Sequence, residues 1–130
     1  MGGLELMLTC LALNIYKEAR GETEKGQQAV AMVTLNRARP HGDVCKVVFA
    51  DRQFSWTITD VENGVLRKHA RPDRNSEAWK KAYQVAQESL FTEDFTGGAD
   101  HFHAAHVSPS WAGRMKPVGQ WGRHKFFRSN

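Results

Sequence analysis

The chain has 130 residues and an ordinary globular composition, which predicts one domain spanning residues 1–130 with its own hydrophobic core. Its formal net charge of +4 favours anionic partners, such as an acidic glycan, over cationic ones. The sequence holds no internal repeat, low-complexity tract or linker, which argues against repeat and multidomain architectures within these residues.

The N-terminal segment predicts a helix whose apolar face ends in a carboxylate. Apolar side chains recur in steps of four, three and four residues, at Leu4, Leu8, Leu11 and Ile15. The next step of three reaches Glu18, and Gly21 then ends the helix. Loss of water on a core-facing stripe raises a carboxyl pKa into the range that a general acid needs. The alternative is that Glu18 bends out to solvent with only its stem on the core.

This apolar segment is not expected to be a secretory leader or a membrane span, because no basic residue precedes it and it is too short. It contains Cys10, whereas Cys45 lies in a second, shorter apolar run. We expect two buried thiols rather than a disulfide.

Three further helices are predicted, from about Glu24 to Arg39, from Val44 to about Ala50, and from Ser76 or Asn75 to Leu90. Thr23 and Asp43 are suited to cap the first two. One face of the helix that begins at Glu24 collects Ala29, Val30, Val33 and Arg37.

The remaining segments are predicted to be irregular or extended. The stretch around Phe54 and Trp56 is expected to be a loop or a short strand, and residues 60–75 are polar and irregular. Residues 101–107 alternate in the manner of a strand, and residues 122–127 are expected to return beside them. A small hairpin or sheet should therefore pack against a helical body.

Three kinds of chemistry compete. Glycoside cleavage would use Glu18 as the acid, in a groove with walls from Phe54, Trp56, Trp111 and Trp121 and hydrogen bonds from Gln53, Ser55 and His103. A zinc site would use His101, His103 and His106, with Asp100 or His124 added, but no zinc motif is present. Nucleic-acid binding through Arg67–Arg74 is less well supported than a solvated basic surface.

Several sequence blocks occur in a characteristic order along almost the whole chain. They are residues 13–22 (LNIYKEARGE), 26–31 (GQQAVA), 35–37 (LNR), 44–49 (VCKVVF), 53–56 (QFSW), 98–103 (GADHFH), Trp111 and 122–127 (GRHKFF). In this order they closely resemble the cell wall hydrolase family of the spore cortex-lytic enzyme SleB. Phe102 stands where tyrosine is frequent in that family.

The resemblance implies a mostly helical α+β fold like that of lysozyme and the lytic transglycosylases, with a small β-hairpin or sheet. It also implies cleavage of the MurNAc–GlcNAc bond of peptidoglycan, with Glu18 as the catalytic residue and with Gln53 and Ser55 lining the groove. No cofactor and no metal are expected. The full set of expected substrate contacts is Gln53, Phe54, Ser55, Trp56, His101, His103 and Trp111.

The reaction type depends on a second carboxylate, which a hydrolase places across the sugar ring. Glu22, Asp60 and Asp100 are the candidates, but no spacing pairs any of them with Glu18. Without a partner, the MurNAc C6 hydroxyl attacks C1 and Glu18 acts first as acid and then as base. The resemblance favours this lytic transglycosylase route, which gives 1,6-anhydroMurNAc.

Three alternatives remain open from the sequence. They are a hydrolytic muramidase, a zinc-dependent N-acetylmuramoyl-L-alanine amidase that uses His101, His103 and His106, and a wall-binding module without catalysis.

Spore enzymes of the family usually carry a signal peptide and often a separate peptidoglycan-binding domain, and this sequence shows neither. We therefore expect a phage endolysin-like protein, made in the cytoplasm of the host bacterium and released to act on the wall. The expected partners are peptidoglycan glycan strands, with no nucleic acid and no membrane insertion, and the protein is expected to be a monomer.

Overall fold

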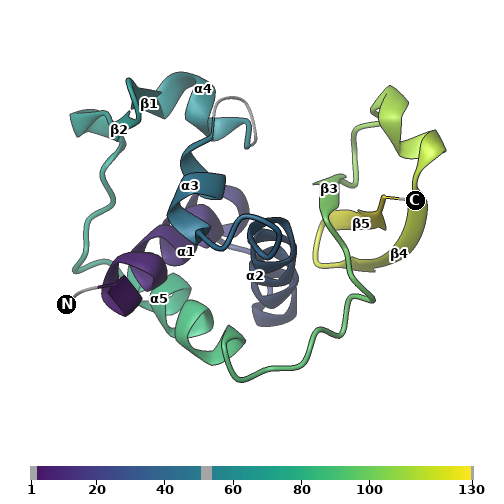
Figure 1. Cartoon of the computed structure of the whole chain (residues 1–130), viewed down its shortest axis with the longest axis horizontal. Helices are drawn as coiled ribbons and strands as arrows, with labels where there is room; N and C mark the ends of the chain where they lie inside the picture. Colours follow the sequence, from purple (N-terminus) through teal and green to yellow (C-terminus); the bar gives the residue numbers. More distant parts are fainter. Residues whose placement is uncertain (1–2, 51–53, 130) are drawn as a thin grey trace.

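The computed structural model describes residues 3–50 and 54–129 and consists of a helical body beside a small sheet (Figure 1). The helical body contains α1 (Gly3–Ala19), α2 (Glu24–Ala38), α3 (Val44–Phe49), α4 (Trp56–Asp60) and α5 (Glu77–Ser89). The sheet contains β3 (His101–Ala104), β4 (Lys116–Trp121) and β5 (His124–Arg128). A two-stranded hairpin, β1 (Val61–Glu62) and β2 (Val65–Leu66), follows α4. These elements confirm the predicted mostly helical α+β class.

The predicted helix boundaries are confirmed by their caps. Thr23 accepts a hydrogen bond from the backbone N–H of Gly26, and Asp43 accepts one from the N–H of Lys46. At the start of α5, the side chain of Ser76 accepts a hydrogen bond from the N–H of Trp79. Gly21 follows α1 with a φ of +86°, the left-handed conformation in which glycine commonly ends a helix.

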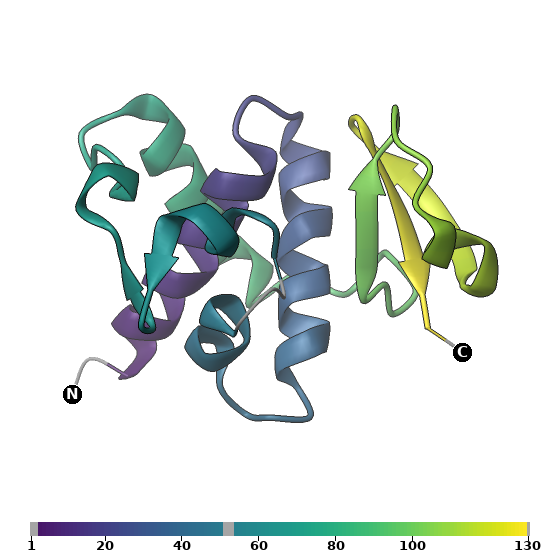
Figure 2. The same cartoon turned by 90° about the horizontal axis from the view of Figure 1, so that it is seen from above.

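The core forms around α1, which packs against α2, α3 and α5. Leu11 and Ile15 are completely buried, and Leu8 nearly so, as the apolar stripe predicts. Leu4 is 61% exposed, so the prediction was wrong for the first member of the stripe. The start of α1 lies at the edge of the helical body, where neighbouring helices no longer cover it (Figure 2).

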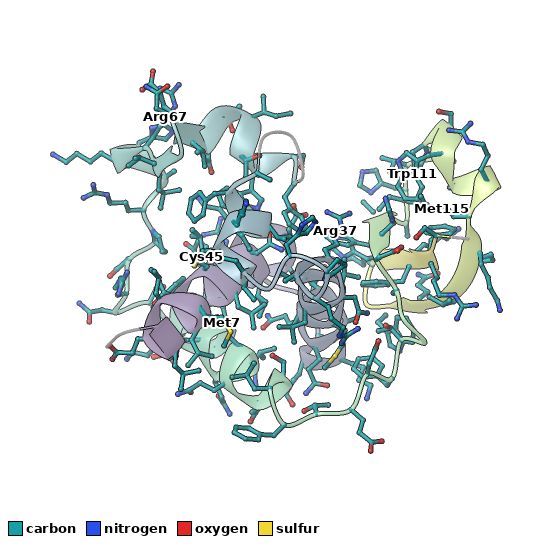
Figure 3. All side chains as sticks on the ribbon, viewed as in Figure 1. Met7, Arg37, Cys45, Arg67, Trp111 and Met115 are labelled. Carbon is teal, nitrogen blue, oxygen red and sulfur yellow. A yellow bond between two sulfur atoms is a disulfide. The ribbon has the colours of Figure 1, made fainter. Side chains whose placement is uncertain are left out.

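The two cysteines correct a second expectation, because Cys10 and Cys45 form a disulfide (Figure 3). The packing of α3 against α1 brings their Cα atoms to 5.2 Å, within the range for a disulfide. The expectation of two free buried thiols rested on local sequence, which does not report that these two helices lie side by side.

The segment after Phe54, expected to be a loop or a short strand, begins the short helix α4 at Trp56. The carbonyl of Phe54 accepts hydrogen bonds from the N–H and the hydroxyl of Thr57. Phe54 and Trp56 are both buried in the core, which selects this compact conformation over an extended one. Beyond it, the hairpin β1–β2 and a 3-10 turn, η1 (Lys68–Ala70), occupy the polar region.

The sheet has the order β3-β5-β4, with both pairs antiparallel. The two predicted strands are confirmed as β3 and β5, whereas β4 was not predicted because Pro117 and Gly119 interrupt its pattern. Trp121 packs between Phe95 and Phe126, with ring centres 5.4 and 5.3 Å away. Trp121 therefore takes part in the packing of the sheet, and its use as a groove wall stays a prediction.

Within the described residues, no helix combines the length and apolar character needed to cross a membrane.

Candidate active site

The carboxyl group of Glu18 lies in the last turn of α1, where the apolar stripe leads it. The residue is partly exposed, but its surroundings remove enough water to raise the pKa of Glu18 from 4.5 to about 7. Desolvation causes this increase, and the positive charge of Arg37 opposes part of it. A carboxyl group of this pKa is substantially protonated at neutral pH and is suited to general acid chemistry.

Arg37 connects Glu18 to the sheet. It lies near the end of α2, and its guanidinium carbon is 4.6 Å from the centre of the Phe54 ring. Its Nε donates a 2.6 Å hydrogen bond to the backbone carbonyl of Asp100, just before β3. Burial lowers the pKa of Arg37, whereas Asp100 and Glu18 raise it, and an arginine in this setting keeps its charge. Figure 3 shows Arg37 on the side of α2 that faces the sheet, with Trp111 beyond β3.

A buried polar network fixes the segment that carries Phe54. The indole N–H of Trp56 donates to Oδ1 of Asn14 at 2.8 Å, and Nδ2 of Asn14 donates to Thr34 at 2.9 Å. Thr34 in turn donates to the carbonyl of Val30. Trp56 is thus committed to the core, whereas Ser55 is exposed beside it. Gln53, expected to line the groove, lies outside the described residues.

The sheet contributes an aromatic cluster. His101 and His103 share one face of β3, and their rings lie 5.4 and 5.6 Å from the Trp111 ring. The ring of Phe127 stacks on His103 at 5.1 Å and meets Trp111 at 5.4 Å. Trp111 lies in a 3-10 turn, η2 (Ser110–Arg114), between β3 and β4. The structure thus brings together three predicted contacts, His101 and His103 from β3 and Trp111 from η2.

The proposed zinc ligands are not arranged as a metal site. Nδ1 of His101 donates to the carboxylate of Asp100 at 2.9 Å, and Nδ1 of His103 donates to the carbonyl of Ala104 at 2.7 Å. His106 is exposed in the turn after β3. Across residues 3–50 and 54–129, no group of three or more histidine, cysteine or carboxylate side chains is placed to hold a metal ion.

The three candidates for a second carboxylate each have positively charged or hydrogen-bonding partners. Asp60 is 2.9 Å from Lys17. Asp100 accepts hydrogen bonds from His101 and from the backbone and hydroxyl of Ser129. Burial alone would raise both pKa values, but these contacts outweigh it and leave the pKa of each carboxyl below its usual value. Both groups are therefore anionic at neutral pH.

Glu22 is the third candidate, and it joins the helical body to the sheet. Its side chain is 6% exposed. Its carboxylate accepts hydrogen bonds from the backbone N–H of Arg123 at 2.6 Å and from Nε of Arg123 at 2.8 Å. Burial acts to raise the pKa of Glu22, but these bonds lower it overall. His124 lies nearby, with Nδ1 3.7 Å from the carboxylate.

A second connection between the sheet and the body lies at the other end of α2. Asn36 donates to the carbonyl of Ala99 at 2.8 Å and to the carboxylate of Asp94 at 2.9 Å. Arg37 holds the adjacent carbonyl of Asp100. The sheet is therefore attached near the start of α2 through Glu22 and near its end through Asn36 and Arg37.

Comparison with known proteins identifies the family. The sequence model of the cell wall hydrolase family matches residues 21–127. The chain belongs to the cell wall hydrolase family. This confirms the resemblance found in the sequence, and the protein is an enzyme that acts on the peptidoglycan of the cell wall. Glu18 lies three residues before the matched segment, so the match does not itself assign a role to it.

Solved structures show that this cell wall hydrolase shares the fold of SleB catalytic domains. The catalytic domain of the Bacillus cereus SleB protein has a TM-score of 0.72 at 24% identity, over 95% of this chain and 91% of that chain. The catalytic domain of the germination-specific lytic transglycosylase SleB from Bacillus anthracis has a TM-score of 0.69 at 24% identity, over 94% of this chain and 93% of that chain. No curated protein sequence is significantly similar to the chain.

Two residues of the hydrolase site were not singled out from the sequence. The sequence places Arg37 on the apolar face of its helix. A charged residue on an apolar face is the signal that identified Glu18, and it could have identified Arg37 as well. Asn14 lies one helical turn before Glu18, and its complete burial gives no comparable pattern because it stands among residues that are all buried.

Proposed function

We propose that this cell wall hydrolase cleaves the MurNAc–GlcNAc bond of peptidoglycan as a lytic transglycosylase, with Glu18 as general acid and then general base. The observation that carries the proposal is the raised pKa of Glu18, about 7, at the end of a buried helix. The first step of the reaction requires a carboxyl group that is protonated at neutral pH.

In the first step, protonated Glu18 donates its proton to the oxygen that joins MurNAc C1 to GlcNAc. The bond from C1 to that oxygen breaks, GlcNAc leaves with a free hydroxyl group, and positive charge develops on the MurNAc ring. Glu18 is now a carboxylate. Its negative charge stabilises the developing positive charge on the ring beside it.

In the second step, the C6 hydroxyl of the same MurNAc attacks C1, and the Glu18 carboxylate takes the hydroxyl proton. The product is a 1,6-anhydro ring, no water is consumed, and Glu18 returns to its protonated form. A pKa near 7 suits both halves of this cycle, because the same group must give and receive a proton. The second carboxylate of a glycoside hydrolase is not needed.

The groove is assigned to the space between the helical body and the sheet. Arg37, supported from behind by the buried ring of Phe54, would form the wall on the helical side. Trp111 with His101 and His103 would form the opposite wall, with an aromatic surface suited to the apolar faces of sugar rings. Gln53 and Ser55 stay predicted substrate contacts. The endolysin-like origin, the synthesis in the host cytoplasm before release and the monomeric state also stay predictions.

A hydrolytic muramidase is the alternative closest to this proposal. Asp60 and Asp100 are anionic, as a nucleophile or a general base must be, but each is already held by its own partners. The amidase alternative is disfavoured because, within the described residues, His101 and His103 do not belong to any group of three or more side chains placed to hold a metal ion.

The test is mass spectrometry of the soluble products that the protein releases from purified peptidoglycan. We expect anhydro-muropeptides, one water lighter than hydrolysed products, from the wild-type protein. Glu18→Gln should release none, whereas Glu24→Gln, the same change at a surface residue paired with Lys81, should release them normally. Reducing MurNAc ends would instead establish hydrolysis, and free stem peptides would establish an amidase.

A further inference from the structure

A pocket of about 440 Å³ lies beside Arg37, where the end of α2, α3 and the start of β3 meet. Arg37 and His41 line it from α2 and the following turn, Lys46 and Val47 from α3, and Asp100 and His101 from the sheet. Its volume falls within the range of pockets that hold small ligands, about 300–1,000 Å³.

The charges that line the pocket favour an anion. Arg37 and Lys46 are positively charged, whereas Asp100 contributes the negative charge. The carboxylate of Asp100 is engaged by Ser129 and His101. Lys46 has no ion pair with any carboxylate in the described part of the chain, and its side chain is exposed on the α3 side. A ligand carboxylate in the pocket would give Lys46 a partner that none of the described carboxylates supplies.

The pocket adjoins the aromatic side of the proposed groove, because His101 lines the pocket and its ring also lies 5.4 Å from the Trp111 ring. Arg37, which lines the pocket too, is the residue whose charge acts on Glu18. The cations at the end of α1 do not offer an equivalent site. Lys17 is held by Asp60 at 2.9 Å, and Arg20 lies 4.4 Å from the centre of the Tyr16 ring and donates to its hydroxyl. Lys46, which lines the pocket and pairs with none of the described carboxylates, is therefore the lysine placed to take a new partner.

The chemistry of the substrate supplies an anion at this place. The ring whose C1 reacts is MurNAc, and MurNAc is the sugar of the strand that carries the peptide stem with its carboxylates. A stem on the reacting ring must leave the groove close to Glu18. We propose that the pocket binds a carboxylate of this stem, so that the enzyme prefers strands with acidic stems. The inference rests on the proposed cleavage at MurNAc C1.

The test compares two soluble glycan-strand substrates at the same ionic strength. One carries stems with free carboxylates, and in the other these carboxylates have been converted to primary amides. We expect the wild-type protein to cleave the acidic strands faster, and we expect Lys46→Gln to reduce this preference roughly three- to tenfold, the range for loss of one charged contact. Lys80→Gln is the control, because Lys80 is also an exposed lysine but lies on α5, outside the lining of the pocket.

Each outcome decides between specific explanations. A preference lost in Lys46→Gln and retained in Lys80→Gln supports the stem pocket. Equal rates of the wild-type protein on both strands, or equal losses in both variants, would overturn it, since general attraction between a basic protein and an acidic polymer would then suffice. If the wild-type protein cleaved neither strand, the proposed glycosidic cleavage itself would fail, which is a different result.

Discussion

The indole N–H of Trp56 donates a 2.8 Å hydrogen bond to Asn14, one helical turn before Glu18 on the same helix. Asn14 is completely buried and is held in turn by Thr34 on α2. The proposed acid and the segment that carries Phe54 thus share one rigid support. The buried Phe54 ring extends this support to Arg37, so the same network positions the residue whose charge acts on Glu18.

Replacing Asn14 with leucine should lower the free energy of unfolding by about 2–3 kcal/mol, because it leaves the buried N–H of Trp56 without an acceptor. Denaturant unfolding measures this change. A double-mutant cycle with Trp56→Phe provides the control, since the cost of Asn14→Leu should shrink once the N–H is gone. Equal costs in both backgrounds would show that the hydrogen bond contributes nothing.

Replacing Glu18 with glutamine should abolish cleavage and stabilise the fold at alkaline pH. The pKa of Glu18 is about 7 in the folded state, so the folded protein holds this proton more tightly than the unfolded chain. The free energy of unfolding therefore falls as the pH rises from about 4.5 to about 7, by up to about 3 kcal/mol. Glu18→Gln removes this penalty and should be about 2–3 kcal/mol more stable than the wild-type protein above neutral pH.

The matched measurement for Glu18→Gln is made well below the usual carboxyl pKa, at about pH 4 or lower, where both proteins carry a neutral side chain and their stabilities should converge. A folded Glu18→Gln protein that still cleaves peptidoglycan would refute its assignment as the acid. The wild-type rate should also fall as the pH rises through about 7.

Replacing Arg37 with glutamine should move the alkaline limb of the pH–rate profile to higher pH. The positive charge of Arg37 opposes the increase in the Glu18 pKa, so its removal leaves the carboxyl group protonated over a wider range. Arg37→Lys, which keeps the charge, should leave the limb nearly in place. Arg39→Gln removes a charge from an exposed neighbouring residue and serves as the control. A limb that moves to lower pH in Arg37→Gln would contradict the electrostatic coupling.

Replacing Glu22 with glutamine should destabilise the attachment of the sheet by about 1 kcal/mol at neutral pH, because the backbone N–H and the exposed side chain of Arg123 lose a charged acceptor. The pKa of Glu22 is lowered in the folded state. Its contribution is therefore present above the unfolded pKa and is lost as the pH falls through the folded pKa. Thermal unfolding at neutral and acidic pH measures it, and Glu24→Gln is the exposed control. A cost that does not diminish in acid would argue against the ion pair.

Replacing Cys10 and Cys45 together with alanine should lower the free energy of unfolding by about 3–4 kcal/mol, as expected for a disulfide that closes a loop of this length. Chemical unfolding of the double variant measures the change. A reducing agent should destabilise the wild-type protein and leave the variant unaffected. Equal sensitivity of both proteins to reduction would place the effect elsewhere.

The sequence was most informative where structure depends on neighbours three or four residues away. The boundaries of α2, α3 and α5 follow from capping residues that bond within their own first turn. The stripe that leads from Leu8 to Glu18 is a property of one helix, and it identified the carboxylate whose pKa is raised. The ordered sequence blocks also indicated the family, and the family indicated peptidoglycan as the substrate.

The tertiary structure decided which distant residues meet. The disulfide joins residues separated by 35 positions, Arg37 reaches Asp100 across 63 positions, and Glu22 reaches Arg123 across 101. The helix at Trp56 forms because Asn14 and the core accept its side chain, which no nearby residue indicates. Local periodicity specifies which face of a helix is buried, whereas the partner of each buried or charged group is set by how the helices and the sheet pack together.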